Sequence, residues 1–155
     1  MLIMMMGVPG SGKSTIALEY AALYRAKGYN VKIISSDGVR AELYGDESIQ
    51  GDNKQIFSIV ESRIFEQLRA DGIAIYDATN LSSKRRKDFV QRVKAMFPEA
   101  KAHCIDVDPS LGTCLERNEQ RERHVPRSVI CRMYVQKEPP FITEGWDDIK
   151  TVLNS

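Results

Sequence analysis

The chain alternates short apolar runs with longer stretches in which apolar residues recur every three or four positions. The short runs predict strands over residues 2–6, 31–35, 73–76, 102–106 and 149–153. The longer stretches predict helices over residues 13–27, 52–70 and 111–121, and a short helix near residue 37. They also predict a helix that is capped by Ser82 or Ser83 and runs to residue 96, and a last helix that ends before Pro139. Such alternation is typical of a parallel sheet with crossover helices, so the pattern predicts an α/β fold.

Composition and charge narrow the class of protein. The 155 residues are 43% hydrophobic and 28% charged, without repeat or linker, which predicts one globular domain over residues 1–155. Because the formal net charge is only +1, a strongly basic body is excluded, and any nucleic-acid contact needs a local patch. The three cysteines lack zinc-ligand spacing and indicate reduced thiols. No apolar run is long enough for a membrane span or a signal peptide, so we expect a cytoplasmic protein.

The segment from Gly7 to Ser14 matches the phosphate-binding pattern G-x-x-x-x-G-K-[ST] at every fixed position, between a predicted strand and a predicted helix. Glycines permit backbone conformations in which N–H groups point at phosphate oxygens, and the helix N-terminus adds partial positive charge. We therefore expect Lys13 to reach the β- and γ-phosphates of ATP or another nucleoside triphosphate, and the Ser14 hydroxyl to bind Mg²⁺. The other nucleotide contacts predicted for this P-loop and its helix are Gly7, Pro9, Gly10, Ser11, Gly12 and Thr15.

A second polar group, Asp37 with Arg40, follows the second predicted strand. Ligands gather at the carboxyl ends of strands in an open parallel sheet, and a carboxylate there can accept the proton of an attacking hydroxyl. Arg40 lies one helical turn later on the same face, where its planar fork suits an acceptor phosphate. The alternative is that Asp37 only caps a short helix. Beside a complete P-loop, we favour the general base.

The third predicted strand is followed by Asp77-Ala-Thr-Asn80. An acid in this place has the layout of a Walker-B carboxylate, which orients a magnesium-bound water or holds an arginine; the alternative is a polar turn. The four basic residues 84–87 come next. They predict either a solvated helix face, which is the commoner case, or a contact to a phosphate backbone.

Arg117 and Arg121 are spaced i, i+4 on a predicted helix and would share one face. An arginine on a helical lid over about residues 117–128 would neutralise charge on the γ-phosphate in the transition state, an effect worth about 10³-fold or more in rate. Arg123 competes with Arg121 for this role. The alternative for each arginine is surface solubility.

In chain order, the P-loop, Asp37-x-x-Arg40, Asp77-x-Thr-Asn80 and Arg117-Asn-x-x-Arg121 resemble the polynucleotide 5′-hydroxyl kinase family, the kinase domain of phage-type end-healing enzymes. The similarity covers about residues 2–139. It implies a three-layer P-loop kinase fold with a central parallel sheet and a helical lid, ATP and Mg²⁺ as cofactors, and nucleic-acid 5′ ends as partners.

The resemblance also implies a role for each matching residue. Asp37 would be the general base, Arg40 would hold the 3′-phosphate of the acceptor, Asp77 would support the site beside Asn80, and Arg121 would be the lid arginine. The first hypothesis is therefore an ATP-dependent kinase of RNA or DNA 5′-hydroxyl ends. The alternative is a small-molecule or toxin-like kinase that acts on a nucleoside or sugar, which the near-neutral charge favours. A non-catalytic nucleotide-binding module needs neither base nor lid arginine and ranks last.

Overall fold

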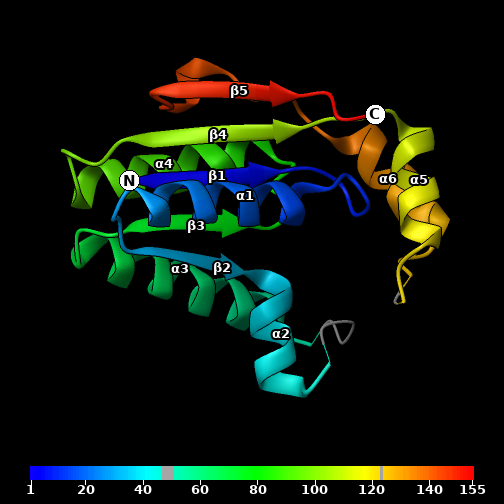
Figure 1. Cartoon of the computed structure of the whole chain (residues 1–155), viewed down its shortest axis with the longest axis horizontal. Coiled ribbons are helices and arrows are strands. Elements are labelled where there is room, and N and C mark those ends of the chain that lie inside the picture. The colour runs from blue at the N-terminus through cyan, green and yellow to red at the C-terminus, as the bar shows by residue number, and fades with distance from the viewer. Residues whose placement is uncertain (47–50, 123) are drawn as a thin grey trace.

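Five parallel strands form one sheet in the order β2-β3-β1-β4-β5 (Figure 1). They belong to a computed structural model that describes residues 1–46, 51–122 and 124–155. The strands are β1 (Leu2–Met6), β2 (Val31–Ser35), β3 (Ile73–Asp77), β4 (Ala102–Val107) and β5 (Asp148–Val152). All five predicted strands are therefore present, each within one residue of its predicted bounds.

Helices connect the strands and cover both faces of the sheet (Figure 1). They are α1 (Lys13–Ala26), α2 (Ser36–Tyr44), α3 (Asn53–Arg69), α4 (Ser83–Met96), α5 (Leu111–Glu119) and α6 (Arg127–Gln136), and a 3-10 turn, η1 (Ile142–Glu144), precedes β5. The core has one apolar layer between the sheet and α1 and another between the sheet and α3 with α4. The predicted three-layer α/β fold is thus confirmed.

The central strand β1 shows why the sequence folds this way. Its five residues are all buried, as expected for a parallel strand with helices on both faces. Because successive side chains point to opposite faces, Leu2, Met4 and Met6 pack toward α3 and α4. Ile3 and Met5 pack toward α1. A continuous apolar run therefore serves two layers at once.

Side-chain caps fix the starts of four helices. Ser35, Asp52, Ser82 and Ser110 each accept a hydrogen bond from the backbone N–H three residues later. Ser82 is thus the cap of α4, one of the two residues predicted for it. The cap of α2 is Ser35, so Asp37 in the first turn of that helix is not needed as a cap.

The sheet order brings the predicted site together at one edge. β3 lies between β1 and β2, with Asp77 beside Met5 on one side and Ser35 on the other. The P-loop therefore follows β1 on one flank of Asp77, and α2 follows β2 on the other. Helices α5 and α6 come after β4 and lie beyond this same edge (Figure 1). Within the described residues, no helix has the length and apolar character that a membrane crossing requires.

Candidate active site

A cleft of about 730 Å³ opens at the carboxyl edge of the sheet. It is bounded by the P-loop, the start of α2, the end of β3 and the α5–α6 segment. The predicted site residues that line it are Pro9, Gly10, Gly12, Lys13, Ser14, Thr15, Asp37, Arg40, Asp77, Arg117 and Arg121. Gly7, Ser11 and Asn80 are predicted site residues that do not line it.

The P-loop needs its glycines for both conformation and space. Gly10 and Gly12 have φ of 84° and 91°, in the left-handed region that side chains disfavour. A Cβ atom on Gly10 would lie 2.3 Å from the carbonyl oxygen of Cys114 in α5, so the loop packs directly against that helix. Gly12 precedes α1 and has no side chain to cap it, which leaves the first amides of α1 available to an anion.

Ser14 and Asp77 meet at the base of the cleft. The Ser14 hydroxyl donates to Oδ2 of Asp77 over 2.7 Å. Asp77 is only 8% exposed, and its Oδ1 is buried without a hydrogen-bond partner in the described structure. Mg²⁺ prefers a hydroxyl or one or two carboxylates together with phosphate oxygens and water. Ser14 and Asp77 therefore fit the predicted magnesium site, where the unpartnered Oδ1 of Asp77 would face the ion or one of its waters.

Asp37 and Arg40 form the other side of the cleft. Nη1 of Arg40 donates to Oδ1 of Asp37 over 2.9 Å, and Nη2 donates to Asn53 at the start of α3 over 3.4 Å. Arg40 is buried, whereas the Asp37 side chain is 57% exposed. The pair therefore presents an open carboxylate that a buried arginine holds in place.

The two predicted lid arginines have different surroundings. Arg117 donates through Nη1 to the Ser11 carbonyl over 3.1 Å and through Nη2 to the carbonyl of Asn154. The guanidinium thus braces the P-loop from behind. Arg121 lies two residues past the end of α5, so the expectation that it shares a helix face with Arg117 is wrong. The chain tightens there, since the Arg121 N–H donates to the Asn118 carbonyl three residues earlier.

Arg121 is exposed and lines the cleft from the segment between α5 and α6. Arg121 and the P-loop residues line the same cleft, and within the described residues the Arg121 guanidinium has no hydrogen bond or ion pair. Arg123, the other predicted lid arginine, lies outside the described residues.

Asn80, in the turn after β3, was predicted to contact the acceptor, but its side chain has other partners. Asn80 has a left-handed φ of 49°. Its side-chain amide donates to the Met5 carbonyl over 2.7 Å and to the Ala78 carbonyl over 3.3 Å. The amide is therefore directed at β1 and its own turn, and it fixes the chain between Asp77 and α4.

The basic run 84–87 is also not uniform. Lys84, Arg85 and Lys87 are exposed, as either predicted role requires. Arg86 is 1% exposed and forms a buried ion pair with Glu144, so neither a solvated face nor a phosphate contact describes it. The reason is helical periodicity, since Arg86 shares the buried face of α4 with Phe89, Val90 and Val93.

A second cavity, of about 640 Å³, adjoins the cleft behind Gly12 and was not predicted. It shares Gly12, Thr15 and Arg117 with the cleft, and β5 and the tail add Val152 and Asn154. The Asn154 amide donates to the Ser11 carbonyl over 3.1 Å, across 143 residues of sequence. No local pattern in the sequence announces a contact over that separation.

Comparisons with known proteins identify the family and the fold of the chain. The family model AAA_33, described as an AAA domain, matches residues 2–140. The chain is 28% identical over 153 residues to L-seryl-tRNA(Sec) kinase of Methanococcus maripaludis, and the match covers 95% of this chain and 56% of the relative. The chain therefore spans little more than half the length of that curated relative.

Two solved structures show the same fold. Kti12 of Chaetomium thermophilum, in complex with ADP-AlF3, superposes with a TM-score of 0.75 at 20% identity, over 100% of this chain and 90% of that one. A chain of the Pnkp1/Rnl/Hen1 complex superposes with a TM-score of 0.60 at 23% identity, over 99% of this chain and 46% of that one.

Proposed function

Because the chain belongs to the AAA domain family AAA_33 and has the fold of the P-loop kinases, we propose that it is an ATP-dependent kinase that phosphorylates the 5′-hydroxyl end of a polynucleotide. One observation carries the proposal. The exposed carboxylate of Asp37 faces the same cleft as the P-loop, and a buried arginine holds it there. A module that only bound a nucleotide would need no such pair.

The donor side follows from the P-loop. The amides at the start of α1 and the Lys13 ammonium bind the β- and γ-phosphates. Ser14 and Asp77 would hold Mg²⁺, which neutralises charge on the phosphates when bound. The adjoining cavity behind Gly12 has both apolar and polar lining and the size for a nucleoside.

The acceptor side follows from α2. The acceptor hydroxyl donates its proton to Asp37 as its oxygen forms a bond to the γ-phosphorus. The bond from that phosphorus to the β–γ bridging oxygen breaks, and ADP leaves with the electron pair. Arg121 stabilises the charge that develops on the transferred group, while Arg40 orients Asp37 and offers its remaining N–H groups to a phosphate of the acceptor.

A second candidate acceptor is a hydroxyl group carried on a tRNA. It is favoured by the match to L-seryl-tRNA(Sec) kinase, which runs over 95% of this chain. The donor site, the base and the lid arginine would act in the same way. Only the group beside Asp37 would differ.

Transfer of labelled phosphate from [γ-³²P]ATP separates these acceptors. The panel holds 5′-hydroxyl RNA and DNA oligonucleotides, the same oligonucleotides with a 5′-phosphate as matched blanks, serylated tRNA with its deacylated form, and a nucleoside with simple sugars. We expect label on the 5′-hydroxyl oligonucleotides and none on the blanks. Label confined to serylated tRNA would select the second candidate, and label confined to the nucleoside or sugars would overturn both.

A further inference from the structure

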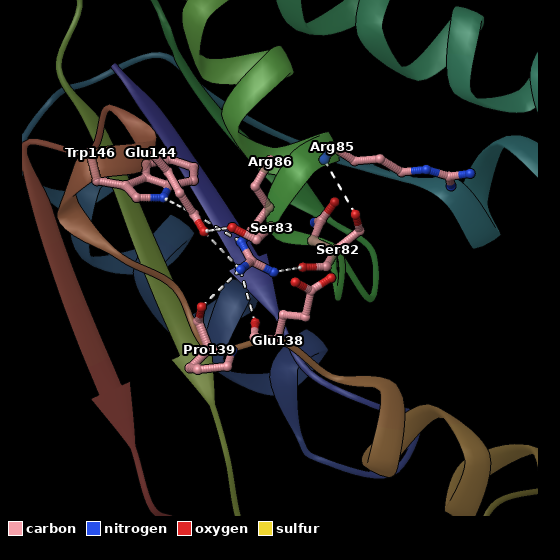
Figure 2. A network of polar contacts seen from close by, with 9 residues as sticks. Ser82, Ser83, Arg85, Arg86, Glu138, Pro139, Glu144 and Trp146 are labelled. Atoms are coloured by element: carbon pink, nitrogen blue, oxygen red, sulfur yellow. Dashed lines mark hydrogen bonds and ion pairs between the residues drawn. The ribbon is translucent and has the colours of Figure 1, made fainter.

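Arg86 is a buried cation that the proposed reaction does not use (Figure 2). It lies in the first turns of α4 and is 1% exposed. Figure 2 shows its side chain between α4, the turn after β3, the segment after α6 and the approach to β5. In sequence they form two stretches, because the turn after β3 runs into α4 and the segment after α6 runs into the approach to β5. Arg86 and Glu144 belong to different stretches and are 58 residues apart.

From its place on α4, the guanidinium of Arg86 binds the other three segments. Nε and Nη2 each donate to one carboxylate oxygen of Glu144 over 3.0 Å. Nη1 donates to the Asn80 carbonyl over 2.8 Å. Nη2 also donates to the carbonyls of Glu138 over 2.9 Å and Pro139 over 3.1 Å. The planar guanidinium of arginine has three nitrogens that donate in different directions. A lysine at position 86 would have a single nitrogen and could not reach all of these acceptors.

The Glu144 carboxylate likewise has several hydrogen-bond partners. Its carboxylate also accepts from the Ser83 hydroxyl over 2.5 Å and from the Trp146 indole N–H over 2.9 Å. A buried ion pair adds little net stability compared with a well-packed apolar pair, because desolvation offsets the attraction. Such a pair is better explained by the geometry that it imposes.

The network reaches the active site by two short routes. The Asn80 turn holds the P-loop, since the Asn80 amide binds Met5 and the Gly7 N–H donates to the Thr79 carbonyl over 3.1 Å. The segment after α6 is held to the same turn, since the Glu138 N–H donates to the Leu81 carbonyl over 3.0 Å. Helix α6 contributes Val129 and Met133 to the wall of the cleft.

We propose that Arg86 is a positioning residue for phosphoryl transfer: it fixes the turn that follows Asp77 and the base of the α5–α6 segment in one relative placement. The proposal rests on the proposed kinase function for its catalytic consequence. Its structural content is independent of the acceptor. Reacting groups misplaced by even about 1 Å lose about 100-fold in rate, so a clamp of this kind has a measurable effect on turnover.

Arg86→Lys is the direct test, and Arg92→Lys is its matched control. Arg92 lies on the same helix and makes the same two-pronged pair, with Glu61 over 2.8 and 2.9 Å, but at an exposed position. Amide hydrogen exchange is followed in both variants and in the wild type. Turnover is measured well below the unfolding temperature and is expressed per nucleotide-binding site, so that unfolded molecules do not count.

In Arg86→Lys, exchange is expected to accelerate about tenfold or more over residues 78–82 and 136–141, with α1 unchanged. The kcat is expected to fall about 10- to 100-fold, with the KM for ATP within about twofold of wild type. Arg92→Lys should match the wild type in every measurement. Glu144→Gln keeps the shape of the network without its charge, and it should reproduce the same local exchange if Arg86→Lys does not fold.

A purely structural role predicts uniform acceleration of exchange across the molecule and an unchanged kcat per binding site. Either result, or wild-type exchange in both segments, would overturn the proposal. If the wild type labels no acceptor in the panel, the kinase proposal fails, while the local exchange still tests the clamp.

Discussion

Gly10 and Gly28 are two residues with nearly the same backbone conformation and different surroundings. Their φ values are 84° and 92°, so both lie in the left-handed region. A Cβ atom on Gly10 would meet the Cys114 carbonyl at 2.3 Å, whereas a Cβ on Gly28 would meet nothing within 4 Å. Alanine would therefore have the same conformational cost at both positions, but it would have a steric cost only at position 10.

Gly28→Ala should lower the free energy of unfolding by about 1–2 kcal/mol, which is the left-handed penalty alone. Gly10→Ala should lower it further and weaken nucleotide binding at least tenfold, because the P-loop must withdraw from α5. Denaturant unfolding and titration with a fluorescent ATP analogue measure the two effects. Equal losses in the two variants would show that the close approach to Cys114 has no consequence.

At the scale of elements, two arginines on and just after α5 differ in their contacts within the part of the chain that the structure describes. Arg117 is bound to the Ser11 and Asn154 carbonyls, whereas Arg121 is exposed at the cleft. Arg121→Ala should therefore lower kcat by about 10³-fold with unchanged stability. Arg117→Ala should weaken ATP binding and lower stability, since it removes the brace behind the P-loop.

Arg132→Ala is the control for these arginine variants, because Arg132 is exposed on α6 and does not line the cleft. Steady-state kinetics and thermal unfolding of the three variants supply the comparison. Loss of kcat in Arg117→Ala with none in Arg121→Ala would reverse the assignment.

The helices and strands could be predicted from the sequence. The strands follow from short apolar runs and the P-loop from fixed residue spacing, because both are local. Position 86 could also have been assigned to the core, since it is in phase with Phe89, Val90 and Val93 on α4. Its partner Glu144 is 58 residues away, so the buried pair itself could not be predicted. The brace of Asn154 on Ser11 is a long-range contact of the same kind.

At the scale of the whole molecule, the Arg86–Glu144 pair joins α4 to the 3-10 turn before β5, across 58 residues of sequence. Burial alone would raise the pKa of Glu144, but hydrogen bonds from Arg86, Ser83 and Trp146 outweigh it and hold the pKa below its ordinary value of 4.5. A carboxylate with a lowered pKa stabilises the fold above the unfolded value, and this stability is lost as the pH falls through the folded pKa.

The protein should therefore lose stability as the pH is lowered from about 4.5. Glu144→Gln should be less stable than the wild type at pH 7 and should show a smaller further loss in acid, because its side chain does not titrate. Urea unfolding at a series of pH values measures both slopes. Parallel curves for the two proteins would mean that Glu144 does not contribute to the acid transition.

The central claim is that Asp37 accepts the proton of a hydroxyl while the P-loop holds ATP beside it. The sharpest variant is Asp37→Asn, which keeps the oxygen that Arg40 contacts and removes the base. Glu42→Gln is a close control, because Glu42 also lies on α2, is paired to an arginine and has a side chain that is 57% exposed, like that of Asp37.

Phosphate transfer from [γ-³²P]ATP to the best acceptor of the panel, measured beside ATP affinity, is the decisive experiment. We predict that Asp37→Asn binds ATP within about twofold of the wild type and transfers phosphate about 10²- to 10⁴-fold more slowly, while Glu42→Gln is unchanged. Near-normal transfer by Asp37→Asn would contradict the account.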